Sequence, residues 1–259
     1  MNKYHLKPWL PYRDTIADFL NLRPDRNMAH ANFEVDISKM TAIIAERNIR
    51  VHSTLSHLAY LLWCYAQAIK QHPEMQWMKY KKQLFVFDDV DISMIFEKTS
   101  SENHKVPAPY IFRAAQNKSY DELLKELVIA NNKTLDELQL RKKSSIFKAL
   151  PEFMRLFILR RALRHPLKWK EALGTVAFTT LGMTIRNRRF WAIPIGPYGC
   201  MLAAGSSYSY KDESGSRNGW CLTFNFDHNL NDGGPAIRFG RTFIQLLESA
   251  EGLIGKESE

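Results

Sequence analysis

Residues 224–235 read FNFDHNLNDGGP and place a histidine, His228, at the end of an apolar run. In WCLTFNFDH, the alternation typical of a strand puts His228 on the same face as four large apolar side chains. One interpretation is a core histidine whose two ring nitrogens are both hydrogen-bonded. The other is an imidazole that stays neutral near pH 7 and accepts a proton as a general base.

Asp232 lies four residues after His228, in a turn that continues with Gly233, Gly234 and Pro235. Its carboxylate can cap the following helix or pair with a buried cation. A polar group at the end of a strand, beside a permissive turn, is where ligands reach into α/β sheets. The turn therefore favours a proton-transfer site over a core histidine.

The elements that must position this turn follow from the periodicity of the apolar residues. Helices are predicted over 13–21, 38–47, 53–71, 118–140, 145–173 (broken at Pro151 and Pro166) and 235–249. Strands are predicted over 31–38, 83–87, 88–98, 174–182, 200–210 and 220–228, with 83–87 and 88–98 as a hairpin or adjacent strands and 212–219 as a hairpin turn. Strands mixed with helices in irregular order predict an α/β sandwich with a mixed sheet.

The composition is that of a folded globular protein, with 259 residues of which 45% are hydrophobic and 24% charged. Cys64, Cys200 and Cys221 are scattered, which argues against a disulfide framework or a zinc site and indicates a reducing compartment. The N-terminal residues lack the pattern of a signal peptide. The apolar stretch 55–70 is shorter than a membrane span and is expected to be a buried core helix. We therefore expect a soluble cytoplasmic protein.

Several blocks of the sequence resemble the dihydrolipoamide acyltransferases, the core subunits of 2-oxo acid dehydrogenase complexes. D-H-x-x-x-D-G at 227–233 resembles their catalytic signature, which chloramphenicol acetyltransferase shares as H-x-x-x-D-G and carrier-protein condensation domains use in similar form. PYRDTIADFL (11–20), AHANFEVDIS (29–38) and GTVAFTTLGM (174–183) follow in the order of that family. The resemblance runs from about residue 10 to 250 and implies a chloramphenicol acetyltransferase-like two-layer sandwich.

The resemblance implies an acyl transfer that depends on a coenzyme A or lipoyl thioester and on no metal. His228 matches the general base, and Thr179 stands where the family has the serine whose hydroxyl stabilises the oxyanion. Asp232 matches an aspartate that pairs with an arginine of the first helix, here Arg13. The family also implies a homotrimer in which His228 of one chain faces Thr179 of its neighbour.

Binding of coenzyme A or acyl-CoA is expected at Thr180, Arg186 and Arg188, because a cluster of arginines can meet phosphates. Two departures from the family stand nearby: Thr179-Thr180 replaces its Ser-Asn pair, and Asn229 replaces its arginine. They leave open a catalytically degenerate member that acts as an oligomeric scaffold or as a basic membrane- or partner-binding protein.

The sequence shows no lipoyl domain, peripheral-subunit-binding domain or linker, so we expect a lone catalytic domain over 1–259 with a basic helical insert at about 141–172. Residues 141–170 contain ten Lys or Arg and one Glu, a net charge of 10 − 1 = +9 that equals the charge of the whole chain. Three interpretations remain: a solvated, core-packing helix pair, a surface for an anionic membrane or an acidic carrier protein, and a lid over the acyl channel. Nucleic acid is not expected, because the aromatic residues do not form a stacking platform.

Overall fold

The computed structural model describes residues 12–253 apart from 24–25, 48–52, 101–102, 139–146, 148, 182–184, 186 and 214. Its helices are α1 Tyr12–Leu20, α2 Ser38–Arg47, α3 Ser53–Gln71, α4 Tyr120–Asn132, α5 Leu135–Leu138, α7 Glu152–Ala162, α8 Pro166–Leu173 and α9 Gly233–Ser249, with single 3₁₀ turns η1 Pro73–Gln76 and η2 Ala115–Asn117. Its strands are β1 Met28–Asp36, β2 Met78–Tyr80, β3 Gln83–Phe85, β4 Ile92–Thr99, β5 Lys105–Phe112, β6 Val176–Thr180, β7 Cys200–Asp212 and β8 Gly215–Asp227.

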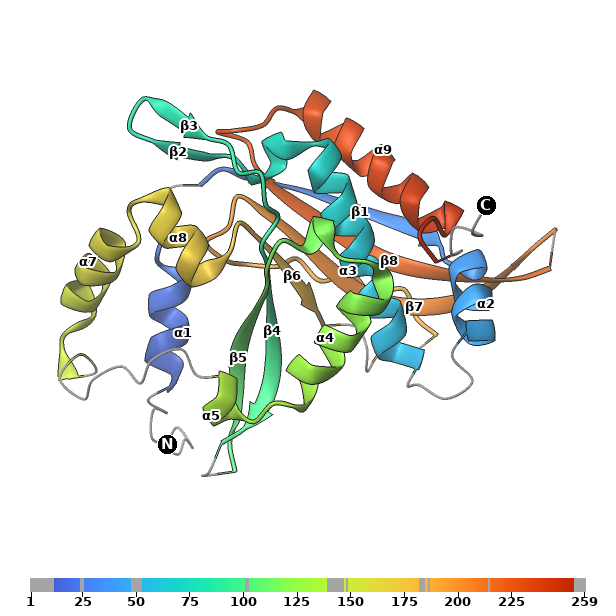
Figure 1. Ribbon diagram of the computed structural model, residues 1–259, viewed down its shortest axis with the longest axis horizontal. Helices are drawn as coiled ribbons and strands as arrows, with labels where there is room; N and C mark the ends of the chain where they lie inside the picture. The colour runs from blue at the N-terminus through green and yellow to red at the C-terminus, as the bar shows by residue number, and fades with distance from the viewer. Residues whose placement is uncertain are drawn as a thin grey trace, which may run out of the picture.

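A mixed sheet of six strands in the order β1-β8-β7-β6-β4-β5 forms one layer of the fold. β6 runs parallel to β4 and to β7, and the other neighbours are antiparallel. The helices α3, α4 and α9 form the second layer across one face of the sheet (Figure 1). The predicted α/β sandwich with a mixed sheet is therefore confirmed.

The helix α3 is the centre of the core, because it is apolar all round and packs against α4 and α9 as well as the sheet. Leu61 and Leu62 of α3 are fully buried, in one cluster with Phe239 of α9 and Leu222 and Phe224 of β8. The stretch 55–70 is a buried core helix, as the sequence predicts. Among the described residues, no helix combines the length and the hydropathy that a bilayer crossing requires.

The expected pairing of 83–87 with 88–98 is wrong. β3 pairs with β2, whereas β4 lies between β6 and β5. The reason is the acidic stretch before β4, where the buried carboxylate of Asp91 accepts hydrogen bonds from Arg113 and from the backbone N–H of Ala114. That stretch turns toward the segment after β5 and does not continue the β2–β3 hairpin.

After Pro151, the described part of the basic segment contains the helices α7 and α8, and the predicted breaks at Pro151 and Pro166 are confirmed. Residues 139–146, which hold its first three cations, lie outside the described residues. The helix α7 is attached to α1 by a buried, two-fold ion pair: Arg155 Nε lies 2.8 Å from Asp18 Oδ2, and Nη2 lies 3.1 Å from Oδ1. The insert is thus fixed to the first helix of the fold.

Candidate active site

The turn after β8 is held by the buried side chain and carbonyl of Asp227. The backbone N–H of Asn229 donates to Asp227 Oδ1 (3.0 Å), and the carbonyl of Asp227 accepts from Leu230 (3.0 Å) and Asn231 (3.1 Å). An aspartate that bonds the N–H two residues on forms an Asx turn, which fixes a tight bend. His228 is therefore carried by a defined turn.

A second segment, just before β1, is bonded to the same turn. The N–H of His228 donates to the carbonyl of Asn27 (2.8 Å), and Asn27 Nδ2 donates to Asn229 Oδ1 (2.8 Å). Beneath them, Arg26 Nε lies 3.8 Å from Asp227 Oδ2, and 8% and 6% of the two side chains are exposed. Sequence reasoning missed Arg26 and Asn27; it included Asp227 in the motif at 227–233 but assigned it no role in holding the turn.

The imidazole of His228 is half exposed and faces Asp232. His228 Nδ1 lies 3.9 Å from Asp232 Oδ1, and 53% of the histidine side chain is accessible. The interpretation of His228 as an enclosed core histidine is therefore wrong. At 3.9 Å the two atoms are too far apart for a hydrogen bond, so Asp232 lies beside the ring as a nearby exposed carboxylate.

Asp232 is not part of a buried ion pair. Its side chain is 88% exposed, and although it occupies the N-cap position of α9 it makes no capping hydrogen bond. Arg13 is exposed on α1, and its guanidinium lies 5.7 Å from the ring of Tyr12. The expected Arg13–Asp232 pair is wrong for the single chain, because the buried arginine–aspartate pair of this region joins Arg26 to Asp227.

Thr179 and Thr180 end β6 on opposite faces of the sheet. Phe178 packs in the main core, so alternation assigns Thr180 to the helix-covered face and Thr179 to the other. The hydroxyl oxygen of Thr180 is buried and has no hydrogen-bond partner among the described residues. An orphaned buried hydroxyl of this kind fits a site that a ligand completes.

A single chain does not bring Thr179 and His228 together. Thr179 lies beside Ala203 of β7, and Ala203 lies beside Thr223 of β8. His228 is 228 − 223 = 5 residues further along β8, so the two side chains are roughly 17 Å apart along the strand direction. The two predicted catalytic groups are therefore separated within one chain: Thr179 lies at the C-terminal end of β6, and His228 lies in the turn after β8.

Of the predicted coenzyme-binding residues, Thr180 and Arg188 lie near Thr179. Arg188 is exposed, and its carbonyl accepts a hydrogen bond from Ser206, two residues beyond the β6 partner Ala204. The neighbouring Arg189 is engaged, because its Nε lies 3.1 Å from Glu34 Oε1. Arg186 lies outside the described residues.

The cysteines are poorly suited to act as nucleophiles. All three are free and buried, and burial raises the pKa of the Cys64 and Cys221 thiols and that of Cys200 to about 12. In the described part of the chain, no group of three His, Cys, Asp or Glu side chains is placed to hold a metal ion.

Comparison with known proteins identifies the class of fold. No family model and no curated protein matches the sequence. Solved structures do match over nearly the whole chain: the dihydrolipoamide acetyltransferase (E2p) of Azotobacter vinelandii has a TM-score of 0.70 and 15% identity, covering 97% of this chain and 94% of that one. The chain thus has the fold of a 2-oxo acid dehydrogenase acyltransferase core.

Two further structures support the same fold. A probable dihydrolipoamide acetyltransferase of Listeria monocytogenes 4b F2365 has a TM-score of 0.67 and 15% identity, covering 99% of this chain and 98% of that one. The cubic core of the pyruvate dehydrogenase multienzyme complex has a TM-score of 0.66 and 15% identity, covering 97% and 94%. The expectation of this fold from the sequence motifs is confirmed.

Proposed function

We propose that the chain is an acyltransferase that moves an acyl group from a coenzyme A or lipoyl thioester to a thiol or hydroxyl acceptor. The observation that carries the proposal is the half-exposed His228, whose Nδ1 faces Asp232 in a turn fixed by buried groups. Similarity to proteins named as acetyltransferases supports it. For the A. vinelandii protein, a serine, a histidine and an asparagine were studied for roles in catalysis, and this chain offers Thr179, His228 and Asp232.

In this proposal the imidazole Nε2 of His228 takes the proton from the acceptor as its sulfur or oxygen attacks the thioester carbonyl. The Thr179 hydroxyl donates to the oxyanion that forms. When the tetrahedral intermediate collapses, the carbon–sulfur bond of the donor breaks and the leaving thiolate takes the proton back from His228. Asp232 orients the ring and stabilises the imidazolium. Coenzyme A is held by Thr180 and by Arg186 and Arg188.

We also propose that the active unit is a homotrimer. His228 and Thr179 are separated within one chain, so a complete site needs His228 from one copy and Thr179 from another. The similar cubic core belongs to a protein that assembles from many copies. Residues 1–259 would form one catalytic domain with the insert at 141–172, and the free thiols fit the reducing cytoplasm.

The test measures acyl transfer from a panel of acyl-CoAs to small thiol and hydroxyl acceptors. His228→Ala should lower the rate by roughly 10²–10⁴-fold, the usual contribution of a general base, while leaving the circular dichroism spectrum unchanged. His104→Ala, at an exposed histidine in the turn after β4, should match wild type. Transfer by His228→Ala at the wild-type rate would refute the proposal.

The second candidate is a degenerate member of the fold that serves as an oligomeric scaffold. It is favoured by Asn229, whose side chain is committed to a structural hydrogen bond with Asn27 where the family has an arginine. A thermal shift with the same panel of acyl-CoAs separates the two candidates. Stabilisation by at least one thioester supports the enzyme, and no shift across the panel supports the scaffold.

A further inference from the structure

A large basic groove lies beside α7. It is a cavity of ≈ 1030 Å³ that α7 forms with the β2–β3 hairpin, the segment after α1 and the start of α8. Six cations line it and no carboxylate does: Arg23, Lys79, Lys81, Arg160, Arg161 and Arg164. Four of these cations, namely Lys79, Lys81, Arg161 and Arg164, form no ion pair with a carboxylate among the described residues. The groove is thus complementary to a surface that carries many negative charges.

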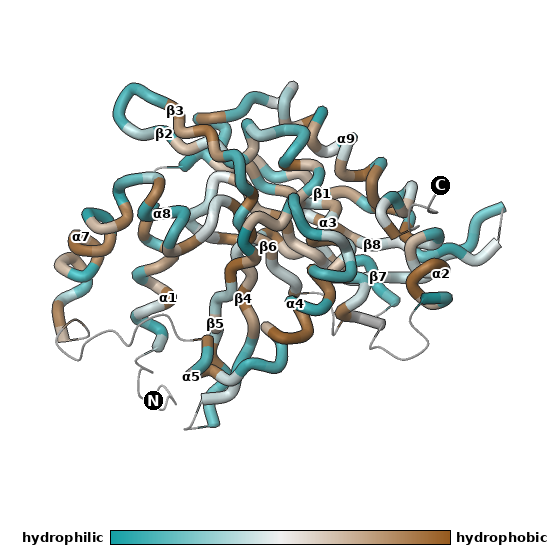
Figure 2. Tube along the Cα trace, in the orientation of Figure 1, coloured by the Kyte–Doolittle hydropathy of each residue, from teal (hydrophilic) through white to brown (hydrophobic). Residues whose placement is uncertain are grey.

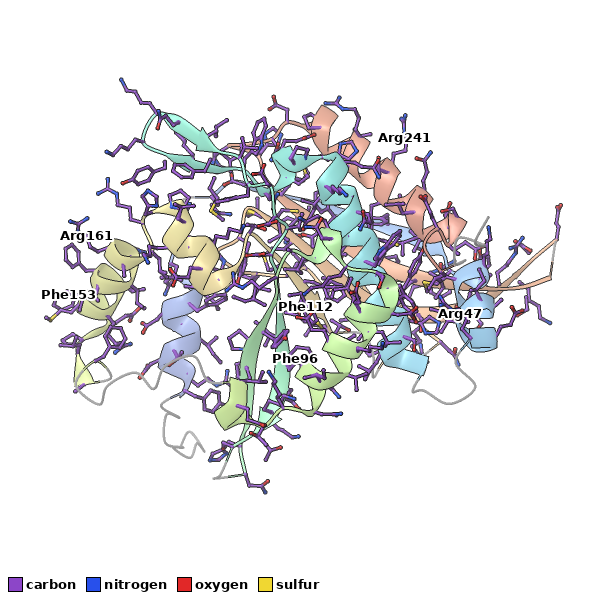
Figure 3. The ribbon with its side chains drawn as sticks, viewed as in Figure 1. Arg47, Phe96, Phe112, Phe153, Arg161 and Arg241 are labelled. Carbon is purple, nitrogen blue, oxygen red and sulfur yellow. The ribbon has the colours of Figure 1, made fainter. Side chains whose placement is uncertain are left out.

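The outer face of α7, at the mouth of this groove, carries exposed apolar side chains next to cations. Phe153 and Phe157 are one helical turn apart and are 72% and 70% exposed, and Met154 and Ile158 beside them are 40% and 41% exposed. Figure 3 shows Phe153 and Arg161 on the side of α7 that faces away from the sheet, and the hydropathy of α7 remains mixed at this edge of the molecule (Figure 2). A contiguous exposed apolar patch marks an interaction site.

The opposite side of α7 is fixed by the buried Arg155–Asp18 pair, so the outer face cannot turn inward without breaking it. A lid over the acyl channel would place its apolar side chains toward the sheet, whereas these point outward. An acidic protein would satisfy the cations but would leave two neighbouring phenylalanines without a role. Aromatic side chains flanked by arginines are instead the composition of helices that lie in the bilayer interface.

We propose that the basic groove and the outer face of α7 dock on an anionic lipid bilayer, a role beyond the proposed acyl transfer. Phe153 and Phe157 insert at the level of the upper acyl chains, while the cations of α7 and of the β2–β3 hairpin contact lipid phosphates. Binding then has an electrostatic part that salt screens and an apolar part that salt does not. The chain associates with the surface and does not span the membrane.

The test is sedimentation of the full chain with vesicles of phosphatidylcholine alone and of phosphatidylcholine mixed with phosphatidylserine. Wild type should bind only the mixed vesicles, and rising salt should weaken this binding without abolishing it. Arg160→Glu/Arg161→Glu should lower the partition coefficient by about tenfold or more. Phe153→Ser/Phe157→Ser should lower it by a similar factor and should remove the part that resists salt.

Lys39→Glu/Lys125→Glu is the matched control, because it changes the net charge equally at exposed lysines of α2 and α4. It should bind as wild type does. The proposal is overturned if wild type binds neither kind of vesicle, if it binds neutral vesicles equally well, or if the control loses as much as the α7 variants. It is also overturned if Phe153→Ser/Phe157→Ser binds the mixed vesicles as strongly as wild type. A smaller oligomer mass for this variant alone, measured without lipid, would overturn it as well, because the outer face of α7 would then be buried against a second copy of the chain.

Discussion

The turn that carries His228 (the His228 end of β8) and the C-terminal end of β6 that carries Thr179 (the Thr179 end) are built differently, although each carries one half of the proposed chemistry. At the His228 end, the turn is bonded to Asp227, to Asn27 and through Asp227 to the buried Arg26. At the other end, β6 stops at Thr180, whose hydroxyl oxygen is buried without a described partner, and the next residue, Leu181, is 58% exposed. The turn is thus held by contacts within the chain, whereas the end of β6 presents a buried hydroxyl without a described partner.

This difference indicates where a second molecule must contribute. In the proposed mechanism the histidine needs a fixed position, because it has to reach both acceptor and donor, and contacts within the chain hold its turn. The proposal places the neighbouring copy at the end of β6, where Leu181 is exposed beside the buried Thr180 hydroxyl. The site is thus expected to form only when the His228 end of one copy meets the Thr179 end of another.

Mixing two inactive variants gives the largest expected effect. His228→Ala and Thr179→Ala should each lose roughly 10²-fold or more in transfer rate, since one removes the base and the other the oxyanion donor. When the two are unfolded together and refolded, random assembly should restore about a quarter of the wild-type activity, because one interface in four joins an intact His228 to an intact Thr179. The measurement is the transfer rate of the mixture.

Each variant refolded alone is the control and should stay inactive. A mixture that remains as inactive as its components would show that the two groups act within one chain. That outcome would contradict the separation of Thr179 and His228 in the sheet and would remove the basis for a trimeric active unit.

Asp227→Asn should weaken the His228 end selectively. The asparagine oxygen can still accept from the N–H of Asn229, so the substitution removes mainly the charge that faces the buried Arg26. Breaking a buried pair on one side costs about 3–5 kcal/mol of unfolding free energy. Asp232→Asn, at an 88% exposed side chain, should change it by less than about 0.5 kcal/mol. The unfolding free energies of both variants are measured by urea unfolding. Equal losses of stability for Asp227→Asn and Asp232→Asn would contradict the prediction.

Gly205→Ala should act on the Thr179 end through backbone packing. A Cβ at Gly205 would lie 2.1 Å from the carbonyl oxygen of Phe190, so the segment that crosses β7 has to move, at a cost of roughly 1–3 kcal/mol. Gly240→Ala in α9 meets no atom within 4 Å and should instead stabilise by up to about 1 kcal/mol. Thermal unfolding of both variants checks whether Gly205→Ala lowers the melting temperature and Gly240→Ala raises it.

The sequence predicted well those elements whose ends carry their own signals. α3 begins at Ser53 and is followed by Pro73, and α2 likewise has its predicted bounds. The strand β5 was missed because Pro107 and Pro109 argue against a strand, yet β5 is the edge of the sheet, where a missing N–H costs no ladder bond.

The site was predictable only in part, because its contacts join distant segments. The motif identified His228 and Asp232 as neighbours, which lie four residues apart in the chain. It could not show that Arg26 and Asn27, some 200 residues earlier, hold the turn, since that contact depends on β1 pairing with β8. The motif likewise could not show that the buried arginine beside this turn is Arg26, just before β1, whereas Arg13 on α1 is exposed.

The smallest expected effect concerns Cys200, which lies beside Phe226 near the His228 end. Burial raises the pKa of its thiol from 9.0 to about 12, and the Tyr65 hydroxyl lies 3.1 Å from the sulfur. Above pH 9 the unfolded chain loses this proton while the folded chain keeps it, so the stability that is fully present below pH 9 declines as the pH rises toward 12.

Cys200→Ala should reduce that decline by roughly 1 kcal/mol per pH unit, as measured by urea unfolding at pH 9 and about one unit above. Cys221→Ala, nearer the Thr179 end, should reduce it less, because burial raises the pKa of that thiol to a smaller extent. If the unfolding free energies of the two variants fell equally with rising pH, the surroundings of the two thiols would exclude water equally.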